Sequence, residues 1–222
     1  MRIISGTKKS ISIRAPKNLP VRPTTDKVKE SLFNIISNKF NFNELVVLDL
    51  FSGTGNISYE FASRGCSKIL SVDNNYNCIK FINKTASDHN FNIQTKNIDY
   101  KNYIINSKES FDIIFADPPY IFSINQYIEM IDLIKKNNIL RDKGEVIIEH
   151  GSKITLLDYN SNIEEEYRAS INFHCLKHLD KHISTPNSAY INMLKQIGGK
   201  QVTVPNPSRV FCFNSKRLVP EG

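Results

Sequence analysis

The stretch "LVVLDLFSGTGN", residues 45–56, decides the fold because it joins a buried strand to a glycine-containing loop. Its first six residues form an apolar run, interrupted only by Asp49, that is typical of a strand covered on both sides. Gly53 and Gly55 allow the backbone to turn sharply and to approach a ligand closely. The stretch therefore predicts a strand, a ligand-facing loop and a helix, in that order.

The same alternation continues along the chain. Further strands are expected at 68–72, about 91–96, 111–116 and 144–150, and helices at about 57–64, 75–88, 100–107 and 125–137. Continuous apolar strands that alternate with amphipathic helices are typical of a parallel sheet covered on both faces. The sequence therefore predicts the α/β class, with a doubly wound, mostly parallel, Rossmann-like sheet. In such sheets, ligands bind beyond the carboxyl ends of the strands.

Two elements precede this sheet. The runs Ile3-Ile4 and Ile11–Ile13, joined by "SGTKKS", predict a β-hairpin with Gly6 in its turn. The segment "RPTTDKVKESLFNII", residues 22–36, predicts a helix, because apolar side chains recur at helical spacing behind a Thr or Asp cap.

Composition excludes several classes of protein. No apolar run approaches the roughly 18 residues of a membrane span, and the N-terminus lacks the apolar core of a signal peptide. The four cysteines include no C-x-x-C pair and no histidine at ligand spacing, so we expect free, buried thiols and no metal site. A soluble, cytoplasmic protein is expected.

The net charge of +7 is unevenly distributed. Residues 1–29 carry eight Lys and Arg against one Asp, residues 30–176 carry fourteen basic against nineteen acidic side chains, and residues 177–222 carry seven against two. Basic ends on a mildly acidic body suit a protein whose termini bind a polyanion, because Lys and Arg neutralise phosphates. Basic tails also serve only for solubility, so charge alone leaves both interpretations open.

An acid, Asp73, follows the second predicted strand, eighteen residues after Gly55. A carboxylate there accepts hydrogen bonds from ribose hydroxyls, so the glycine loop and Asp73 together indicate a nucleoside-type cofactor. A dinucleotide fingerprint has a third small residue, where this chain has Ser58. Asp49 before the loop would repel a pyrophosphate but suits a cationic cofactor, so S-adenosylmethionine is favoured over a dinucleotide.

The stretch "FADPPY", residues 115–120, follows the fourth strand. Two prolines fix the backbone and remove two donors, so the loop presents carbonyl oxygens. An amine on an aromatic base becomes nucleophilic when acceptors hold its N–H groups, and the Asp117 carboxylate and the Pro118 carbonyl are two such acceptors. Tyr120 offers a face on which an extruded base stacks. We therefore expect Asp117, Pro118 and Tyr120 to be the catalytic residues.

These motifs resemble a known family. Asp117-Pro118-Pro119-Tyr120 with "LDLFSGTGN" resembles the amino-group methyltransferases that use S-adenosylmethionine. The segments "MRIISG" and "RPTTDKVKESLFNII" resemble, more narrowly, the bacterial RsmD-type methyltransferases, and the match covers about residues 1–150. The resemblance implies the class I methyltransferase fold and methylation of a guanine N2 amine in small-subunit (16S) ribosomal RNA.

The resemblance also implies cofactor contacts. Asp49, Phe51, Gly53, Thr54 and Gly55 would line the methionine end, Asp73 and Asn74 would hold the ribose, Asn97 and Ile98 would contact the adenine, and Arg22, Thr24 and Thr25 would close over the pocket. The family usually has an acid and a small apolar residue where this chain has Asn97-Ile98. Asp99 therefore remains an alternative for the adenine contact.

Ribosomal RNA is the implied partner, either naked or within an assembled small subunit, and we expect a monomer. Arg2, Lys8, Lys9 and Arg14 on the hairpin would meet RNA phosphates, and Pro119 would contact the substrate. Two other functions stay open. One is a DNA or RNA adenine-N6 or cytosine-N4 methyltransferase, and the other is an RNA-binding or ribosome-assembly module that binds the cofactor without turnover.

Three parts are expected along the chain. Residues 1–40 form an RNA-facing hairpin and helix that cap the cofactor pocket, residues 41–176 form the methyltransferase domain, and residues 177–222 form a basic extension. The segment "YRASINFHCL", 167–176, is a variant of the family's last hairpin, with Ala169 in place of a glycine. For the extension, a flexible linker or an unrelated appendage is favoured over an extended RNA footprint.

Overall fold

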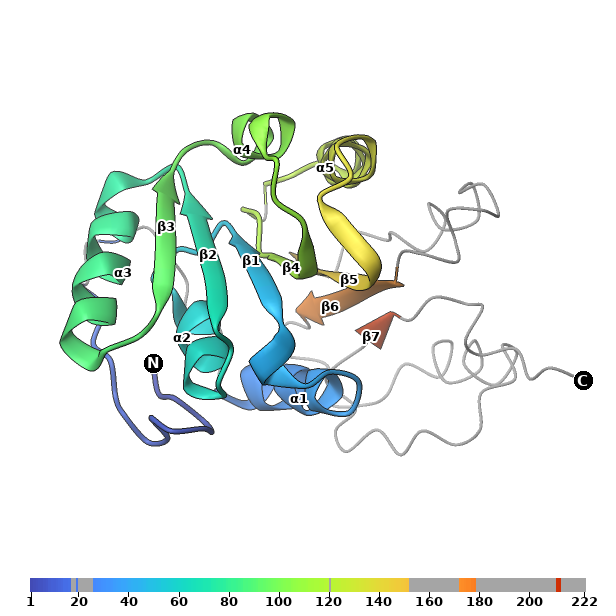
Figure 1. The fold of residues 1–222 in the computed structure, drawn as a ribbon. Coiled ribbons are helices and arrows are strands. Elements are labelled where there is room, and N and C mark those ends of the chain that lie inside the picture. The colour runs from blue at the N-terminus through green and yellow to red at the C-terminus, as the bar shows by residue number, and fades with distance from the viewer. Residues whose placement is uncertain (17–18, 20–25, 120, 152–171, 179–210, 213–222) are drawn as a thin grey trace, which may run out of the picture.

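Helices cover both faces of a seven-stranded sheet (Figure 1). The computed structural model describes residues 1–16, 19, 26–119, 121–151, 172–178 and 211–212, and beyond residue 150 it describes only the backbone. The helices are α1 (Asp26–Ser37), α2 (Asn56–Ser63), α3 (Tyr76–His89), α4 (Tyr100–Asn106) and α5 (Ile124–Lys136), with a short 3-10 helix η1 (Phe42–Glu44). None of the described helices is long and apolar enough to cross a membrane.

The sheet confirms the predicted doubly wound topology. Its strands are β1 (Val46–Leu50), β2 (Lys68–Asp73), β3 (Ile93–Asn97), β4 (Phe111–Ala116), β5 (Leu140–Gly151), β6 (Asn172–His178) and β7 (Phe211–Cys212). The spatial order is β3-β2-β1-β4-β5-β6-β7, and only β7 is antiparallel to its neighbour. The chain moves outward from β1 to β3 and then returns to the other side of β1 with β4. This reversal places the topological switch point between β1 and β4.

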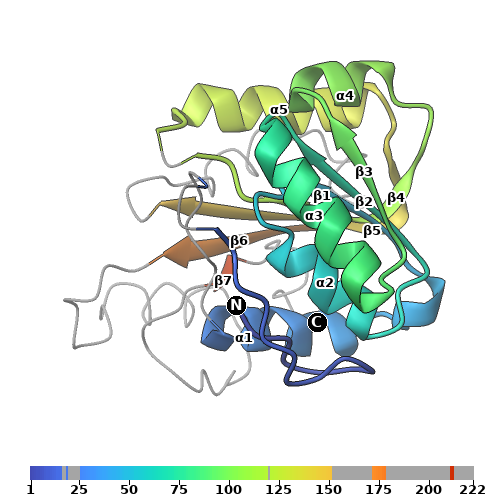
Figure 2. The ribbon, with the colours of Figure 1, turned by 90° about the vertical axis from the view of Figure 1, so that its left-hand side faces the viewer.

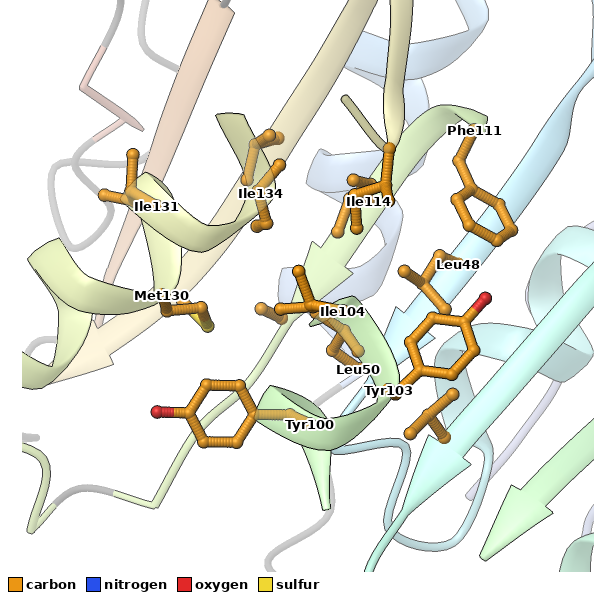
Figure 3. Close-up of a cluster of buried hydrophobic side chains, with 14 of the residues drawn as sticks. Leu48, Leu50, Tyr100, Tyr103, Ile104, Phe111, Ile114, Met130, Ile131 and Ile134 are labelled. Atoms are coloured by element: carbon orange, nitrogen blue, oxygen red, sulfur yellow. The ribbon is translucent and has the colours of Figure 1, made fainter. Parts of the chain in front are cut away.

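The helices α4 and α5 pack on one face of the sheet. Figure 3 shows Tyr100 and Ile104 of α4 and Met130 of α5 gathered over the strands, where they join a cluster of buried apolar side chains that includes Leu48 and Ile114. Alternate residues of a strand point to opposite faces, so Val47 and Ile113 pack on the other side with α1 and α2. Figure 2 shows the two layers of helices with the sheet between them.

The N-terminal segment forms the predicted hairpin, which lies along α2 and α3. Ile3 exchanges backbone hydrogen bonds with the other arm, and the N–H of Ile13 donates to the carbonyl of Met1 over 2.9 Å. Gly6 has a φ of +86° in the turn, and a Cβ there would collide with the backbone of Ser63 at the end of α2. Only glycine therefore allows the turn to lie this close to the helix.

A buried carboxylate, Glu60 of α2, holds the hairpin in place. Glu60 accepts from the backbone N–H groups of Ile4 (2.8 Å) and Ser5 (3.0 Å), and it forms ion pairs with Lys29 (3.3 Å) and Arg64 (2.9 Å). The Lys29 ammonium also donates to the carbonyl of Arg2 and to the side chain of Asn56. One ionic cluster therefore joins the hairpin, α1 and α2.

Most predicted boundaries agree with the structure within two residues. The exception is β5, which begins at Leu140 and not at residue 144. Leu140 pairs with Phe111 ahead of an irregularity in the register of β4 and β5, so the strand includes three charged residues, Arg141, Asp142 and Lys143, that do not look like a buried strand in the sequence. At the other end, β6 extends two residues past 176, and β7 pairs with it from within the C-terminal extension.

Candidate active site

Two predicted functional loops begin side by side at the switch point. Leu50 at the end of β1 pairs in register with Ala116 at the end of β4, and the N–H of Asp117 donates to the carbonyl of Leu50 over 3.4 Å. The glycine loop follows β1, and the D-P-P loop follows β4. Ligands of doubly wound sheets bind at this place, so the topology unites the two motifs.

Asp73, at the end of β2, fixes the shape of the glycine loop. Its carboxylate accepts one hydrogen bond from the N–H of Gly53 and another from the N–H of Asn75, both over 2.8 Å. The two oxygens thus tie the loop after β1 to the turn before α3. The structure therefore places Asp73 in direct contact with the glycine loop.

The loop has the features of a backbone cradle for a ligand. Gly55 has a φ of +79°, and a Cβ there would lie 2.9 Å from both Ile82 and the ring of Tyr59. The hydroxyl of Ser52 is buried in the loop and has no hydrogen-bond partner among the described residues. A buried hydroxyl normally has a partner, so this donor is suited to a polar ligand atom.

Asp49 lies beneath this loop in a buried position. Its carboxylate accepts from the hydroxyl of Ser58 over 2.5 Å, and Ser58 is also 2.7 Å from the hydroxyl of Ser71. Burial raises the pKa of Asp49 to about 7, and the charge of Asp73 adds to the shift, while the bonds from Ser58 oppose it. A nearby positive charge would stabilise the ionised form, so the site favours a cation over a phosphate.

Asp117 points to the same face of the sheet as Asp49. Phe115 packs on the α1 and α2 side, so side-chain alternation brings Asp117 to that side two residues later. Burial of the carboxyl raises the pKa of Asp117 well above its ordinary value, and the charges of Glu149 and Asp49 raise it further. Pro118 next to it is buried and Pro119 is exposed.

Glu149 is a site residue that the sequence analysis missed. It lies on β5, where its neighbour Ile148 pairs with Ala116, and only 2% of its surface is exposed. The sequence alone gives no clear signal for it, because β5 also carries Glu145 and His150, so one more polar residue in this strand does not stand out. Three carboxyl groups from β1, β4 and β5 thus lie on one face at the carboxyl edge of the sheet.

Asn97 and Asp99, at the end of β3 and just after it, make different hydrogen bonds. The side-chain amide of Asn97 donates to the carbonyl of Asp73 over 3.0 Å, and the N–H of Ile98 donates to the same carbonyl over 3.1 Å. Asp99 instead caps α4 by accepting from the N–H of Lys101 over 2.9 Å. Asn97 and Ile98 therefore lie beside Asp73, while one oxygen of Asp99 is engaged in the helix cap. Asn74 is exposed next to them.

Aromatic side chains pack behind the two loops. Phe51, with a φ of +60°, contacts Tyr100 (ring centroids 4.8 Å apart) and Phe122 (5.6 Å), and Phe122 also contacts Tyr127 (5.8 Å). Tyr100 and Tyr103 of α4 are buried in the core between this helix and the sheet. Phe122 was missed because one apolar residue in a loop carries no periodic signal.

The basic residues of the hairpin lie at two distances from the glycine loop. The open end of the hairpin, with Arg2 and Arg14, is beside it, because the sulfur of Met1 lies 3.8 Å from the hydroxyl of Thr54. The turn, with Lys8 and Lys9, lies beside the C-terminal end of α2, about 12 Å away at 1.5 Å per helical residue. The hairpin therefore does not bring all four side chains to one point.

Four of the expected site residues lie outside the described residues, as does Ala169. They are the expected catalytic residue Tyr120 and the expected lid residues Arg22, Thr24 and Thr25. Of the four cysteines, Cys66 and Cys78 are free and buried, as expected, and burial raises the pKa of the Cys66 thiol to about 12.

Several proteins of known name are similar to this chain. A Bacillus subtilis protein named "Putative rRNA methyltransferase YlbH" is 33% identical over 161 residues, which cover 70% of this chain and 85% of that protein. "Ribosomal RNA small subunit methyltransferase D" of Buchnera aphidicola is 30% identical over 158 residues, covering 71% and 79%. The solved structure "Putative methyltransferase yhhF from Escherichia coli" has a TM-score of 0.60 at 22% identity, covering 83% and 84%.

The structural similarity confirms the methyltransferase-like fold. The sequence similarity covers most of the chain as well. A family model described as "Conserved hypothetical protein 95" matches residues 1–176, which include the hairpin, both loops and β5. The resemblance to the RsmD-type family is thereby confirmed. The chain belongs to this family.

Proposed function

We propose that the protein is an S-adenosylmethionine-dependent methyltransferase that modifies the exocyclic N2 amine of a guanine in small-subunit ribosomal RNA. The observation that carries the proposal is the adjacency of the Asp117-Pro118 loop to the glycine loop at the switch point. The names of the two relatives support ribosomal RNA as the substrate. The hairpin segment and "RPTTD" favour the guanine.

The loop residues fit the proposed cofactor. The Asp73 carboxylate stands where it can accept hydrogen bonds from the ribose hydroxyls. Asn97 and Ile98 lie beside it for the adenine, and Asp49 supplies negative charge for the methionine end. We further propose that Phe51, Gly53, Thr54, Gly55 and Asn74 line the cofactor and that Arg22 and Thr24 cover it. The bound cofactor supplies an electrophilic methyl group on a sulfonium.

Asp117 and Pro118 would activate the substrate by position and charge. The Asp117 carboxyl and the Pro118 carbonyl accept the two N–H groups of the amine, which directs the nitrogen lone pair at the methyl carbon. When bound, the cofactor would supply its methyl group to this nitrogen and would leave as a neutral thioether. The methylated nitrogen then releases a proton, for which Asp117 is the nearest acceptor. Its raised pKa suits that role.

The remaining assignments follow from the same proposal. The hairpin cations Arg2, Lys8, Lys9 and Arg14 bind RNA phosphates, and Tyr120 and Pro119 contact the base. We propose a cytoplasmic monomer in which residues 1–40, 41–176 and 177–222 keep the roles expected from the sequence. The direct test compares modified nucleosides in ribosomal RNA from cells with and without the protein by mass mapping. One guanine should lose its N2-methyl group, and an unchanged map would overturn the proposal.

Replacement of Asp73 by Asn should weaken binding of S-adenosylhomocysteine by about 10-fold to 100-fold, measured by calorimetry. Two backbone N–H groups lose a charged acceptor, and each buried donor left without a partner costs about 1–3 kcal/mol. Asp99→Asn is the matched control, because asparagine also caps helices. Its affinity should stay within about twofold. A larger loss in the control would move the adenine contact to Asp99.

Cofactor affinity should depend on pH through Asp49. Because its pKa is about 7, the ionised fraction of the free protein falls about tenfold between pH 8 and pH 6. A cationic ligand binds the ionised form, so a proton must leave below pH 7, and affinity for S-adenosylmethionine should fall by about the same factor. Asp49→Asn should bind weakly with a flat profile. Parallel profiles for the two proteins would exclude Asp49 as the titrating group.

A further inference from the structure

One apolar side chain beside the candidate active site is almost entirely in water. Ile121 is 91% exposed, more than the other exposed large apolar residues of the described chain, which are Tyr76 (64%), Ile105 (53%) and Ile124 (36%). A large aliphatic side chain left in water forgoes the favourable free energy of burial. Ile121 lies four residues after Asp117, so its exposure coincides with the loop that would hold the substrate base.

The backbone around Ile121 is held on both sides. The N–H of Phe122 donates to the carbonyl of Pro119 over 2.9 Å, which closes a tight turn around position 121. Ser123 begins α5 with a capping box, in which its N–H donates to the side chain of Gln126 over 2.9 Å. The first bond closes the turn that contains Ile121, and the second holds the backbone that follows it.

The next residue anchors the turn to the core. The ring of Phe122 packs against Phe51, Tyr100 and Tyr127, with ring centroids 5.6–5.9 Å apart. Phe122 therefore points inward, whereas Ile121 next to it is exposed. Exposed Pro119 and partly exposed Ile124 extend the apolar surface around it.

We infer that Ile121 is a wedge that enters the RNA base stack and fills the place of the base extruded toward Asp117. The inference rests on the proposed function, because a base must leave its stack before its amine reaches Asp117. Extrusion costs a few kcal/mol of stacking, and aliphatic side chains placed between base steps offset that cost in proteins that unstack nucleic acids. A preorganised, exposed isoleucine beside the acceptor loop has the shape and polarity for this task.

The test uses Ile121→Ser, with Ile105→Ser as the matched control. Both residues are exposed isoleucines, and Ile105 lies on α4 outside the two loops. The substrate is small ribosomal subunits from cells that lack the protein, with tritiated S-adenosylmethionine as the donor. We expect Ile121→Ser to lower kcat at saturating subunits by at least about tenfold. The control should match the wild type, and Ile121→Leu should restore most of the rate.

The separate constants distinguish a wedge from a docking contact. A wedge acts after the encounter, so the loss belongs in kcat, while affinity for S-adenosylhomocysteine stays unchanged. A higher KM with unchanged kcat would show a surface contact with RNA or a ribosomal protein and would overturn the wedge. Wild-type activity in Ile121→Ser would overturn it as well. If the wild type itself transfers no methyl group to subunits or RNA, the proposed function fails instead.

Discussion

Replacing Asp117 with Ala should reduce methyl transfer to small ribosomal subunits by at least about 1000-fold, while S-adenosylhomocysteine binds within a few fold of the wild type. The carboxyl is the acceptor nearest the reacting amine, and loss of one preorganised group at a reacting centre costs about 10²- to 10³-fold, with general-base assistance adding to it. The proposed cofactor contacts come from the ends of β1, β2 and β3, so the replacement should leave them in place. Single-turnover transfer of tritium measures the effect.

The same replacement should not destabilise the fold. The charges of Glu149 and Asp49 raise the pKa of Asp117, so these carboxyl groups repel one another when ionised. Removing one of them relieves the repulsion, and the midpoint of urea unfolding at pH 8 should stay equal or rise. Asp88→Ala, at an exposed position on α3, is the control for both activity and stability. Near-normal transfer by Asp117→Ala would refute the mechanism.

The strands and loops were predictable from the sequence because they depend on local patterns. Apolar runs such as 111–116 indicate strands that are buried on both faces. Gly55 indicates a backbone that lies close to neighbouring side chains. These patterns predicted a mostly parallel sheet with both loops at its carboxyl edge, since the carboxyl ends of parallel strands lie at one edge, whereas the order of the strands came from the structure. By the same reasoning we interpreted Asp117 as a functional residue and not as part of an ordinary turn.

Other site residues were not predictable, because their environment comes from distant parts of the chain. Glu149 is an acid in a strand, and only pairing with β4 shows that it lies near Asp117. Lys29 and Glu60 sit on helices, where a charged residue usually faces water. In the structure both are buried, because α1 and the hairpin cover the same face of α2. Ile121 and Phe122 are adjacent apolar residues, of which the first is exposed and the second packs against the core.

We also expect a large effect on stability when the ionic cluster around Glu60 is disrupted. Glu60→Gln should lower the free energy of unfolding by about 3–5 kcal/mol, measured from urea denaturation. Glu60 and Lys29 are 0% and 1% exposed, and burial already lowers the pKa of Lys29. Without the carboxylate, the ammonium stays buried without its main counter-charge. Glu129→Gln removes an exposed pair with Lys101 and should leave the free energy of unfolding nearly unchanged.

A double replacement separates the buried charge from the lost hydrogen bonds. Lys29→Met combined with Glu60→Gln removes both charges, so it should be more stable than Glu60→Gln alone, although the N–H groups of Ile4 and Ser5 still lose their charged acceptor. Hydrogen exchange at these two amides should therefore be fast in both variants. If their exchange stays as slow as in the wild type, Glu60 does not hold the hairpin, and the hairpin must be anchored through Gly6 and Ser63.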